Sequence, residues 1–182
     1  MLNFNKNIKI GDRMIGPDYP TYFIAEIGGN FDGSIEKAKR LIDAAKVAGA
    51  DCAKFQTFTA ETIVSEGGFS KMTLHGVHGS WGRTVSDVFK DVEFPMAWHQ
   101  EIADYCKKVG LDFSTSPYFK EAVDLCADMK VPFIKIGSGE ITWLEMLDYT
   151  ARKGIPVMLS TGDATMSEID EAVRTIEKTG NK

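Results

Sequence analysis

Two lysines lie near the carboxyl ends of two apolar runs of the sequence, where burying a charge is costly unless the charge is used. Lys54 lies in the run CAKFQ and Lys135 in the run PFIKI. Two ammonium groups could neutralise an anion that carries a phosphate and a carboxylate, while hydroxyls and backbone amides satisfy its other oxygens. The hydroxyls that could complete such an anion site are Ser138, Ser160 and either Thr115 or Ser116.

Other uses of these lysines stay open at this point. Each could extend its aliphatic stem towards solvent or pair with a carboxylate. Either could instead form a Schiff base with a carbonyl substrate, as in the lysine-dependent aldolases built on barrels.

Two carboxylates, Glu26 and Glu140, also lie at strand ends. Each could simply pair with a lysine. Alternatively, Glu140 could act as a general acid or base, because a carboxylate in a site that excludes water can have its pKa raised towards neutrality.

The three histidines do not predict a metal site. His75 and His78 are close in sequence but have no third ligand spaced for zinc, and His99 lies in an amphipathic helical pattern. We expect His99 to be a surface or packing residue.

Five apolar runs alternate with five helical patterns. Residues 57–93 have no sustained period and predict a long loop excursion, which is commonly functional or partly disordered. Ser34 is expected to cap the first helix and Ser167 the last. The expected strands are 22–26, 52–56, 111–115, 132–136 and 155–160, and the expected helices are 34–48, 95–109, 120–128, 143–152 and the segment after 167.

This alternation predicts parallel strands that are buried on both faces, and hence an α/β fold. A doubly wound sheet is disfavoured because IGGNFDG lacks the GxGxxG spacing. Polar residues cluster at the carboxyl ends of the strands, which is typical of a (β/α)8 TIM barrel. A barrel needs eight units, so we expect residues 1–182 to be a partial barrel domain that holds about the first five.

The composition excludes several classes of protein. Of the 182 residues, 43% are hydrophobic and 26% are charged, which is typical of a folded globular chain. The 26 acidic residues outnumber the 21 basic ones, which argues against a nucleic-acid or anionic-membrane surface. Residues 1–12 lack the apolar core of a signal peptide, so we expect a cytoplasmic protein. Cys52, Cys106 and Cys126 form no CxxC pair and are expected to be packing residues.

Several ordered motifs resemble the sialic acid synthases and the related phosphoenolpyruvate-dependent nonulosonate synthases. They are FIAEIGGN at 23–30, KFQ at 54–56, STSPY at 114–118, VPFIKIGSGE at 131–140 and LSTG at 159–162. The resemblance covers about residues 15–180. It implies a (β/α)8 barrel followed by a small C-terminal domain that resembles antifreeze proteins.

The resemblance also implies an activity: condensation of phosphoenolpyruvate with an N-acetylated amino sugar such as N-acetylmannosamine, releasing phosphate and a nine-carbon keto acid. Glu140 would act when the carbon–carbon bond forms, and Glu26 would support the mouth. Asn30, Gln56 and Tyr118 would belong to the substrate site, the last two towards the sugar. Phosphoenolpyruvate would be held by Lys54, Lys135, Ser138, Ser160 and Ser116, with Thr115 as the alternative to Ser116.

The sequence departs from the family pattern in the first loop. Phe31 follows Asn30 where the family usually has histidine, and phenyl cannot make the hydrogen bonds of imidazole. We therefore expect an effect on sugar specificity or activity. A catalytically inactive partial barrel that binds an anion or another chain stays open as an alternative.

The resemblance further implies a divalent metal, manganese or magnesium, in the full-length enzyme. Its ligands would come from later strands, so no residue of this chain is assigned to it. The full-length enzyme would be a homodimer. An isolated chain of 182 residues is expected to be inactive and prone to association, because its fifth strand would be an open edge.

Overall fold

Five parallel strands form the centre of the molecule. The structure, a computed structural model, describes residues 4–69, 71 and 82–181. A three-stranded sheet has the order β3 (Ile24–Gly28), β4 (Cys52–Thr57) and β5 (Asp112–Pro117), and β6 (Ile134–Ile136) pairs with β7 (Val157–Leu159). The two sheets meet where the Ser114 hydroxyl donates to the carbonyl of Phe133 at 2.7 Å. All five expected strands are confirmed, with small shifts of their ends.

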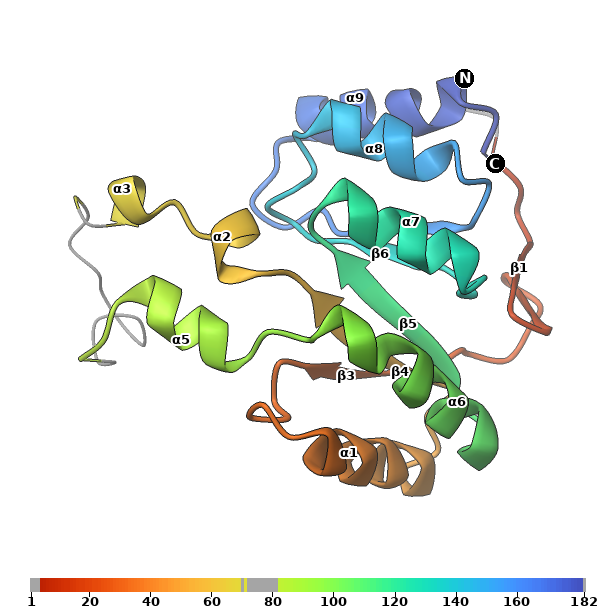
Figure 1. The fold of residues 1–182 in the computed structure, drawn as a ribbon. Coiled ribbons are helices and arrows are strands. Elements are labelled where there is room, and N and C mark those ends of the chain that lie inside the picture. The colour runs from red at the N-terminus through yellow and green to blue at the C-terminus, as the bar shows by residue number, and fades with distance from the viewer. Residues whose placement is uncertain (1–3, 70, 72–81, 182) are drawn as a thin grey trace.

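A helix follows each strand, so the α/β fold is also confirmed. The helices are α1 (Ile35–Val47), α6 (His99–Val109), α7 (Lys120–Asp128), α8 (Leu144–Ala151) and α9 (Met166–Lys178), and the short 3-10 helix η1 (Met96–Trp98) leads into α6. Figure 1 shows α1, α6, α7 and α8 following one another around the strands.

The arrangement is open rather than a closed barrel. Among the described strands, β3 and β7 each pair on one side only. The expected succession of parallel βα units is thus confirmed. The described residues do not form a closed barrel.

The main core lies between the strands and these helices. Alternate strand residues such as Phe55 and Phe113 pack against Ile42 of α1 and Ile102 of α6. Fully burying a phenylalanine contributes roughly 1.5–3 kcal/mol, so this layer is a major source of stability. All three cysteines are buried and free, as expected of packing residues.

Two helix starts test the capping expectations. Ser34 caps α1, because its Oγ accepts the amide of Lys37 at 3.2 Å. The expectation for α9 was wrong: Thr165, not Ser167, is the N-cap. Thr165 and Glu168 form a reciprocal capping box, which places Ser167 inside the helix.

An N-terminal hairpin that was not expected packs at the amino ends of the strands. β1 (Ile8–Ile10) and β2 (Arg13–Ile15) pair antiparallel, and Ile10 packs with Cys52 and Phe133. These contacts place the hairpin at the end of the strands opposite their carboxyl ends.

The excursion at 57–93 contains short helices that the sequence did not predict: α2 (Ala60–Ile63), α3 (Glu66–Phe69) and α5 (Val85–Asp91). Phe58 and Phe89 pack with ring centroids 5.4 Å apart, joining the two ends of the excursion. His75 and His78 lie outside the described residues.

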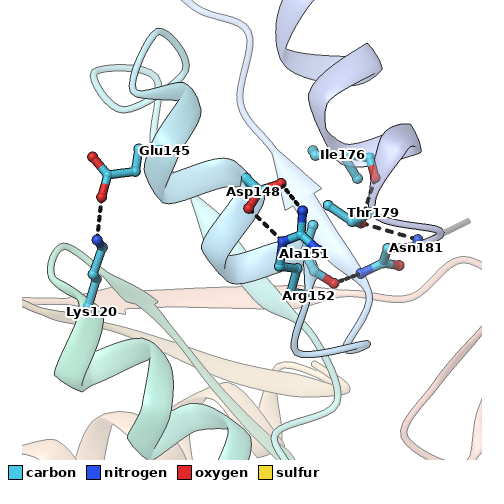
Figure 2. Close-up of polar contacts among 8 residues, drawn as sticks. All are labelled: Lys120, Glu145, Asp148, Ala151, Arg152, Ile176, Thr179 and Asn181. Carbon is cyan, nitrogen blue, oxygen red and sulfur yellow. Dashed lines mark hydrogen bonds and ion pairs between the residues drawn. The ribbon is translucent and has the colours of Figure 1, made fainter.

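The C-terminal turn is tied back to α8. Figure 2 shows the Asn181 side chain donating to the carbonyl of Ala151 at 3.0 Å, and a second bond runs to the carbonyl of Ile155 at 2.8 Å. Lys120 and Glu145 form an ion pair between α7 and α8 (Figure 2). Within the described ranges, no helix combines the length and apolar character needed to cross a bilayer.

Candidate functional site

The pleat of β4 separates its polar residues from its core residues. Phe55 faces the helices, so Lys54 and Gln56 project from the opposite face of the sheet. Lys54 is only 6% exposed, which makes it the most deeply buried lysine of the described chain. A charge at that depth needs a partner.

Glu26 of β3 supplies that partner. Its carboxylate forms an ion pair with the Lys54 ammonium, and Glu26 and Lys54 are register partners in the sheet. The interpretation that Glu26 pairs with a lysine is confirmed.

Lys135 of β6 lies close to this pair. Its ammonium donates to the Ser160 hydroxyl and, at 2.6 Å, to the carbonyl of Ile136. Burial lowers the pKa of Lys135, and the nearby Lys54 charge lowers it further, while Glu26 and Glu140 act in the opposite direction. Two lysines far apart in sequence therefore share one electrostatic environment.

Glu140 follows β6 and lies at the same place. Burial raises the pKa of its carboxyl group, with backbone hydrogen bonds and Lys135 opposing the shift. A methyl group at Gly137 would collide with the Glu140 carboxylate and lie 3.5 Å from the Tyr118 hydroxyl. Burial, Glu140 and Glu26 together raise the pKa of Tyr118 to about 12, so its phenol stays protonated near neutral pH.

Three more predicted residues border this group. Around a hypothetical Cβ on Gly28, Glu26 Oε1 lies at 3.4 Å, Asn30 Nδ2 at 3.8 Å and Gln56 Nε2 at 3.9 Å. Gly28 has φ +55°, a conformation that favours glycine, so the turn after β3 leaves room for these side chains. The Ser138 hydroxyl lies 2.9 Å from a hypothetical Cβ on Gly162, in the turn that follows β7.

The two hydroxyls left open by the sequence face different ways. Thr115 is fully buried, and its hydroxyl lies 2.8 Å from that of Thr57, on the helix face of the sheet. The assignment of Thr115 to the anion site was therefore wrong, because its side chain lies on the face of the sheet opposite to Lys54. Ser116, its neighbour, lies on the Lys54 face by the same alternation.

Phe31 does not reach the site either. It is fully buried, with its ring centroid 5.6 Å from that of Phe94 and 6.1 Å from that of Trp98. The phenyl ring is part of the core and does not lie among these polar side chains. The expected effect on sugar specificity or activity stays a prediction.

The sequence did not identify Thr57 and His99 as polar contributors near the site. His99 is 1% exposed, so the surface alternative was wrong and the packing alternative is confirmed. Its Nε2 lies 2.7 Å from the Thr57 hydroxyl, although 42 residues separate the two. The one sequence signal was a polar residue, Thr57, directly after KFQ. That signal does not indicate which residue it contacts.

The assembled group of side chains, here called the strand-end site, comprises Glu26, Lys54, Gln56, Ser116, Tyr118, Lys135, Ser138, Glu140 and Ser160, with Asn30 at its border. Fixed ammonium groups and hydroxyls can hold an anion, and a carboxyl group with a raised pKa can serve as a proton donor or acceptor.

The described residues do not form a metal centre. In that part of the chain, no group of three or more His, Cys, Asp or Glu side chains is arranged to hold a metal ion. The strand-end site therefore does not fit a metal through its own residues.

The chain is similar in sequence to a synthase and to a polysaccharide biosynthesis protein. It is 34% identical over 168 residues to the N-acetylneuraminate-9-phosphate synthase of Mus musculus, a match that covers 91% of this chain and 45% of the mouse protein. It is 35% identical over 173 residues to the spore coat polysaccharide biosynthesis protein SpsE of Bacillus subtilis, covering 95% of this chain and 45% of SpsE. The chain thus spans about half the length of the curated relatives it matches.

Solved structures are similar to this chain in both fold and sequence. The SpsE crystal structure matches with a TM-score of 0.77 at 33% identity, covering 96% of this chain and 45% of that one. The N-acetylneuraminic acid synthetase of Leptospira borgpetersenii matches with a TM-score of 0.83 at 28% identity, covering 96% and 56%. A model of the NeuB family matches residues 41–182, and the chain belongs to the NeuB family.

Proposed function

We propose that the strand-end site binds phosphoenolpyruvate in an enzyme that condenses it with an N-acetylated, N-acetylmannosamine-like amino sugar. The products would be phosphate and a nine-carbon keto acid of the sialic acid type. The observation that carries the proposal is the placement of Lys54 and Lys135. The two lysines share one electrostatic environment, in which Lys135 bonds Ser160 and the carboxylates of Glu26 and Glu140 lie nearby. The names of the relatives support the reaction class.

Residues 1–182 would form the first five units of a (β/α)8 barrel in a longer enzyme. The relatives, about twice as long as this chain, support this division. The remaining strands, the antifreeze-like domain, a homodimeric assembly and a cytoplasmic location all belong to this proposal.

The roles of the residues follow from their chemistry. The Lys54 and Lys135 ammonium groups would neutralise the phosphate and carboxylate, and Ser116, Ser138 and Ser160 would donate to their oxygens. The ligand would compete with Glu26 for the ammonium of Lys54. The Glu26 carboxylate would therefore leave Lys54 and turn towards solvent when the anion binds. Gln56, Tyr118 and Asn30 would contact the sugar.

Glu140 would handle protons at the bond-forming step. The methylene carbon of phosphoenolpyruvate attacks the sugar aldehyde carbon, water adds to the resulting oxocarbenium carbon, and phosphate leaves as the carbonyl forms. A carboxyl group with a raised pKa can deliver a proton to the aldehyde oxygen and then accept one from water. Manganese or magnesium in the full-length enzyme would polarise that oxygen, with ligands from outside the strand-end site.

Binding to this chain tests the first part of the proposal. Phosphorus NMR titration of phosphoenolpyruvate should show binding that Lys54→Met and Lys135→Met each weaken by about tenfold or more, the loss expected for a charged hydrogen bond. Lys120→Met, which alters an exposed lysine on α7, is the matched control and should leave binding unchanged. Equal binding by all three variants would exclude this site.

Turnover tests the second part. A protein of the relatives' full length that contains this chain should release phosphate from phosphoenolpyruvate in the presence of manganese and one of several N-acetylhexosamines. Binding of phosphoenolpyruvate with no turnover on any of these sugars would support a barrel that binds an anion without catalysis.

One observation favours a second candidate, a Schiff-base aldolase. The lowered pKa of Lys135 increases its fraction of neutral amine, the form that attacks a carbonyl. Borohydride reduction in the presence of a keto acid separates the two functions. Covalent labelling of Lys135 or Lys54 would contradict the synthase proposal.

A further inference from the structure

A chain of buried hydrogen bonds runs beneath the strand-end site. His99 Nδ1 lies 3.1 Å from the carbonyl of Pro95, and Nε2 lies 2.7 Å from the Thr57 hydroxyl. A carbonyl oxygen can only accept, so the ring proton lies on Nδ1. Nε2 therefore accepts the hydroxyl proton of Thr57.

The direction of the remaining bond follows. Because Thr57 donates to His99, its oxygen accepts from the Thr115 hydroxyl at 2.8 Å. His99, Thr57 and Thr115 are each at most 1% exposed. The ring also packs against Phe94, with centroids 4.2 Å apart, and burial lowers the pKa of His99 so that the neutral form persists.

Thr57 connects this chain of bonds to the strand-end site. Its carbonyl accepts the amide of Tyr118 at 3.0 Å. Thr57 directly follows Gln56, and Thr115 directly precedes Ser116. Each threonine is therefore the sequence neighbour of a residue on the Lys54 face of the sheet. The Tyr118 hydroxyl in turn lies against Gly137 and Glu140.

We propose that neutral His99 is a positioning residue, which holds the carboxyl ends of β4 and β5 through Thr57 and thereby orients Tyr118, Gln56 and Ser116. His99 itself does not touch the site. The link to ligand binding rests on the proposed function, whereas the link from His99 to Tyr118 stands on the contacts alone.

Four variants of this chain separate positioning from simple loss of stability. Thr57→Val removes the bridging hydroxyl with little change of shape, and Thr57→Ser restores it. His99→Phe keeps a ring but removes both nitrogens. Thr150→Val is the matched control, because Thr150 is a fully buried threonine of α8 whose hydroxyl has no hydrogen-bond partner.

Amide hydrogen exchange and nitrogen NMR give readouts that need no ligand. Thr57→Val and His99→Phe should speed exchange at the Tyr118 amide by about tenfold relative to the Leu147 amide of α8, as expected for a lost buried hydrogen bond. Thr57→Ser and Thr150→Val should leave this ratio unchanged. The imidazole nitrogens of His99 should report a protonated Nδ1 and an unprotonated Nε2.

Parallel acceleration at Tyr118 and Leu147 in both Thr57→Val and His99→Phe would overturn the proposal, as would a proton on Nε2. Phosphoenolpyruvate affinity should fall in the same two variants and return in Thr57→Ser. If the unaltered chain binds no phosphoenolpyruvate, the proposed function fails for this chain, and the exchange ratio and the ring signature still decide whether His99 holds Tyr118.

Discussion

Glu26 and Lys54 form an ion pair across β3 and β4 in which the two partners differ greatly in exposure. The Lys54 side chain is 7% exposed, whereas the Glu26 side chain is 50% exposed. Water can solvate Glu26 when it loses its partner, but it reaches Lys54 poorly. The two partners are therefore not energetically equivalent.

Replacing each partner should reveal this asymmetry. Glu26→Gln leaves the buried Lys54 ammonium without a charged partner and should lower the free energy of unfolding by about 1–3 kcal/mol. Lys54→Met leaves only a solvated carboxylate and should cost less. Urea denaturation of both variants gives the comparison, and a larger loss for Lys54→Met would contradict it.

Affinity for phosphoenolpyruvate should depend on the protonation of Lys135. Its lowered pKa means that the ammonium is lost below the usual lysine range of about 10.4. Anion binding should therefore weaken as the pH rises from about 8 towards 10, well above the second phosphate pKa of about 6, where the ligand's own charge is nearly constant. Titrations over this range should show a much flatter profile for Lys135→Arg. An identical profile in that variant would assign the pH dependence to another group.

Glu140→Gln should stabilise the chain at neutral pH. The folded state raises the pKa of this carboxyl group, so its favourable contribution is present below the unfolded value and is lost as the pH rises through the folded value. An uncharged amide avoids that loss. Denaturation at about pH 7 and about pH 4 should show a gain that disappears in acid. Turnover of the full-length enzyme should fall in the same variant, and an increase would exclude the catalytic role.

His99 should make the protein less stable in mild acid. Burial lowers its folded pKa, so its contribution is present above the unfolded value of about 6.5 and is lost as the pH falls through the folded value. The free energy of unfolding should therefore drop more steeply between about pH 7 and 5 in the unaltered chain than in His99→Phe. Equal slopes would show that other groups control the acid response.

Phe31→His should destabilise this chain. Phe31 is fully buried among Phe55, Phe94 and Trp98, where an imidazole would bury polar nitrogens in an aromatic cluster. We expect a loss of about 2–3 kcal/mol in thermal or urea unfolding. Phe31→Met is the control and should cost less than about 1.5 kcal/mol. Full stability in Phe31→His would imply an unrecognised partner for the ring nitrogens.

The sequence determined the succession of parallel βα units and which strand carries, or directly precedes, each candidate residue. Apolar runs and helical periods are local signals that persist in the fold, so β4 and α1 lie where they were expected. Period-two alternation also places Lys54 and Gln56 on one face of β4. The pairing of Glu26 with a lysine was one possibility that the sequence left open, and the structure identifies Lys54 as the partner.

Tertiary structure decided which neighbour belongs to the strand-end site. The sequence does not reveal which face of β5 meets the helices, so Thr115 and Ser116 were equivalent until Thr115 was found against Thr57. Phe31 likewise required knowledge of the aromatic cluster that surrounds it. The β1–β2 hairpin was missed because strands of three residues carry almost no periodic signal.

The contact between Thr57 and His99 shows the same limit most clearly. Each residue type is ordinary in its own element, and their 42-residue separation hides the pairing. Local sequence specifies elements because propensity and periodicity act over a few residues. Long-range packing chooses hydrogen-bond partners, because most buried polar groups find one among residues that only the fold brings together.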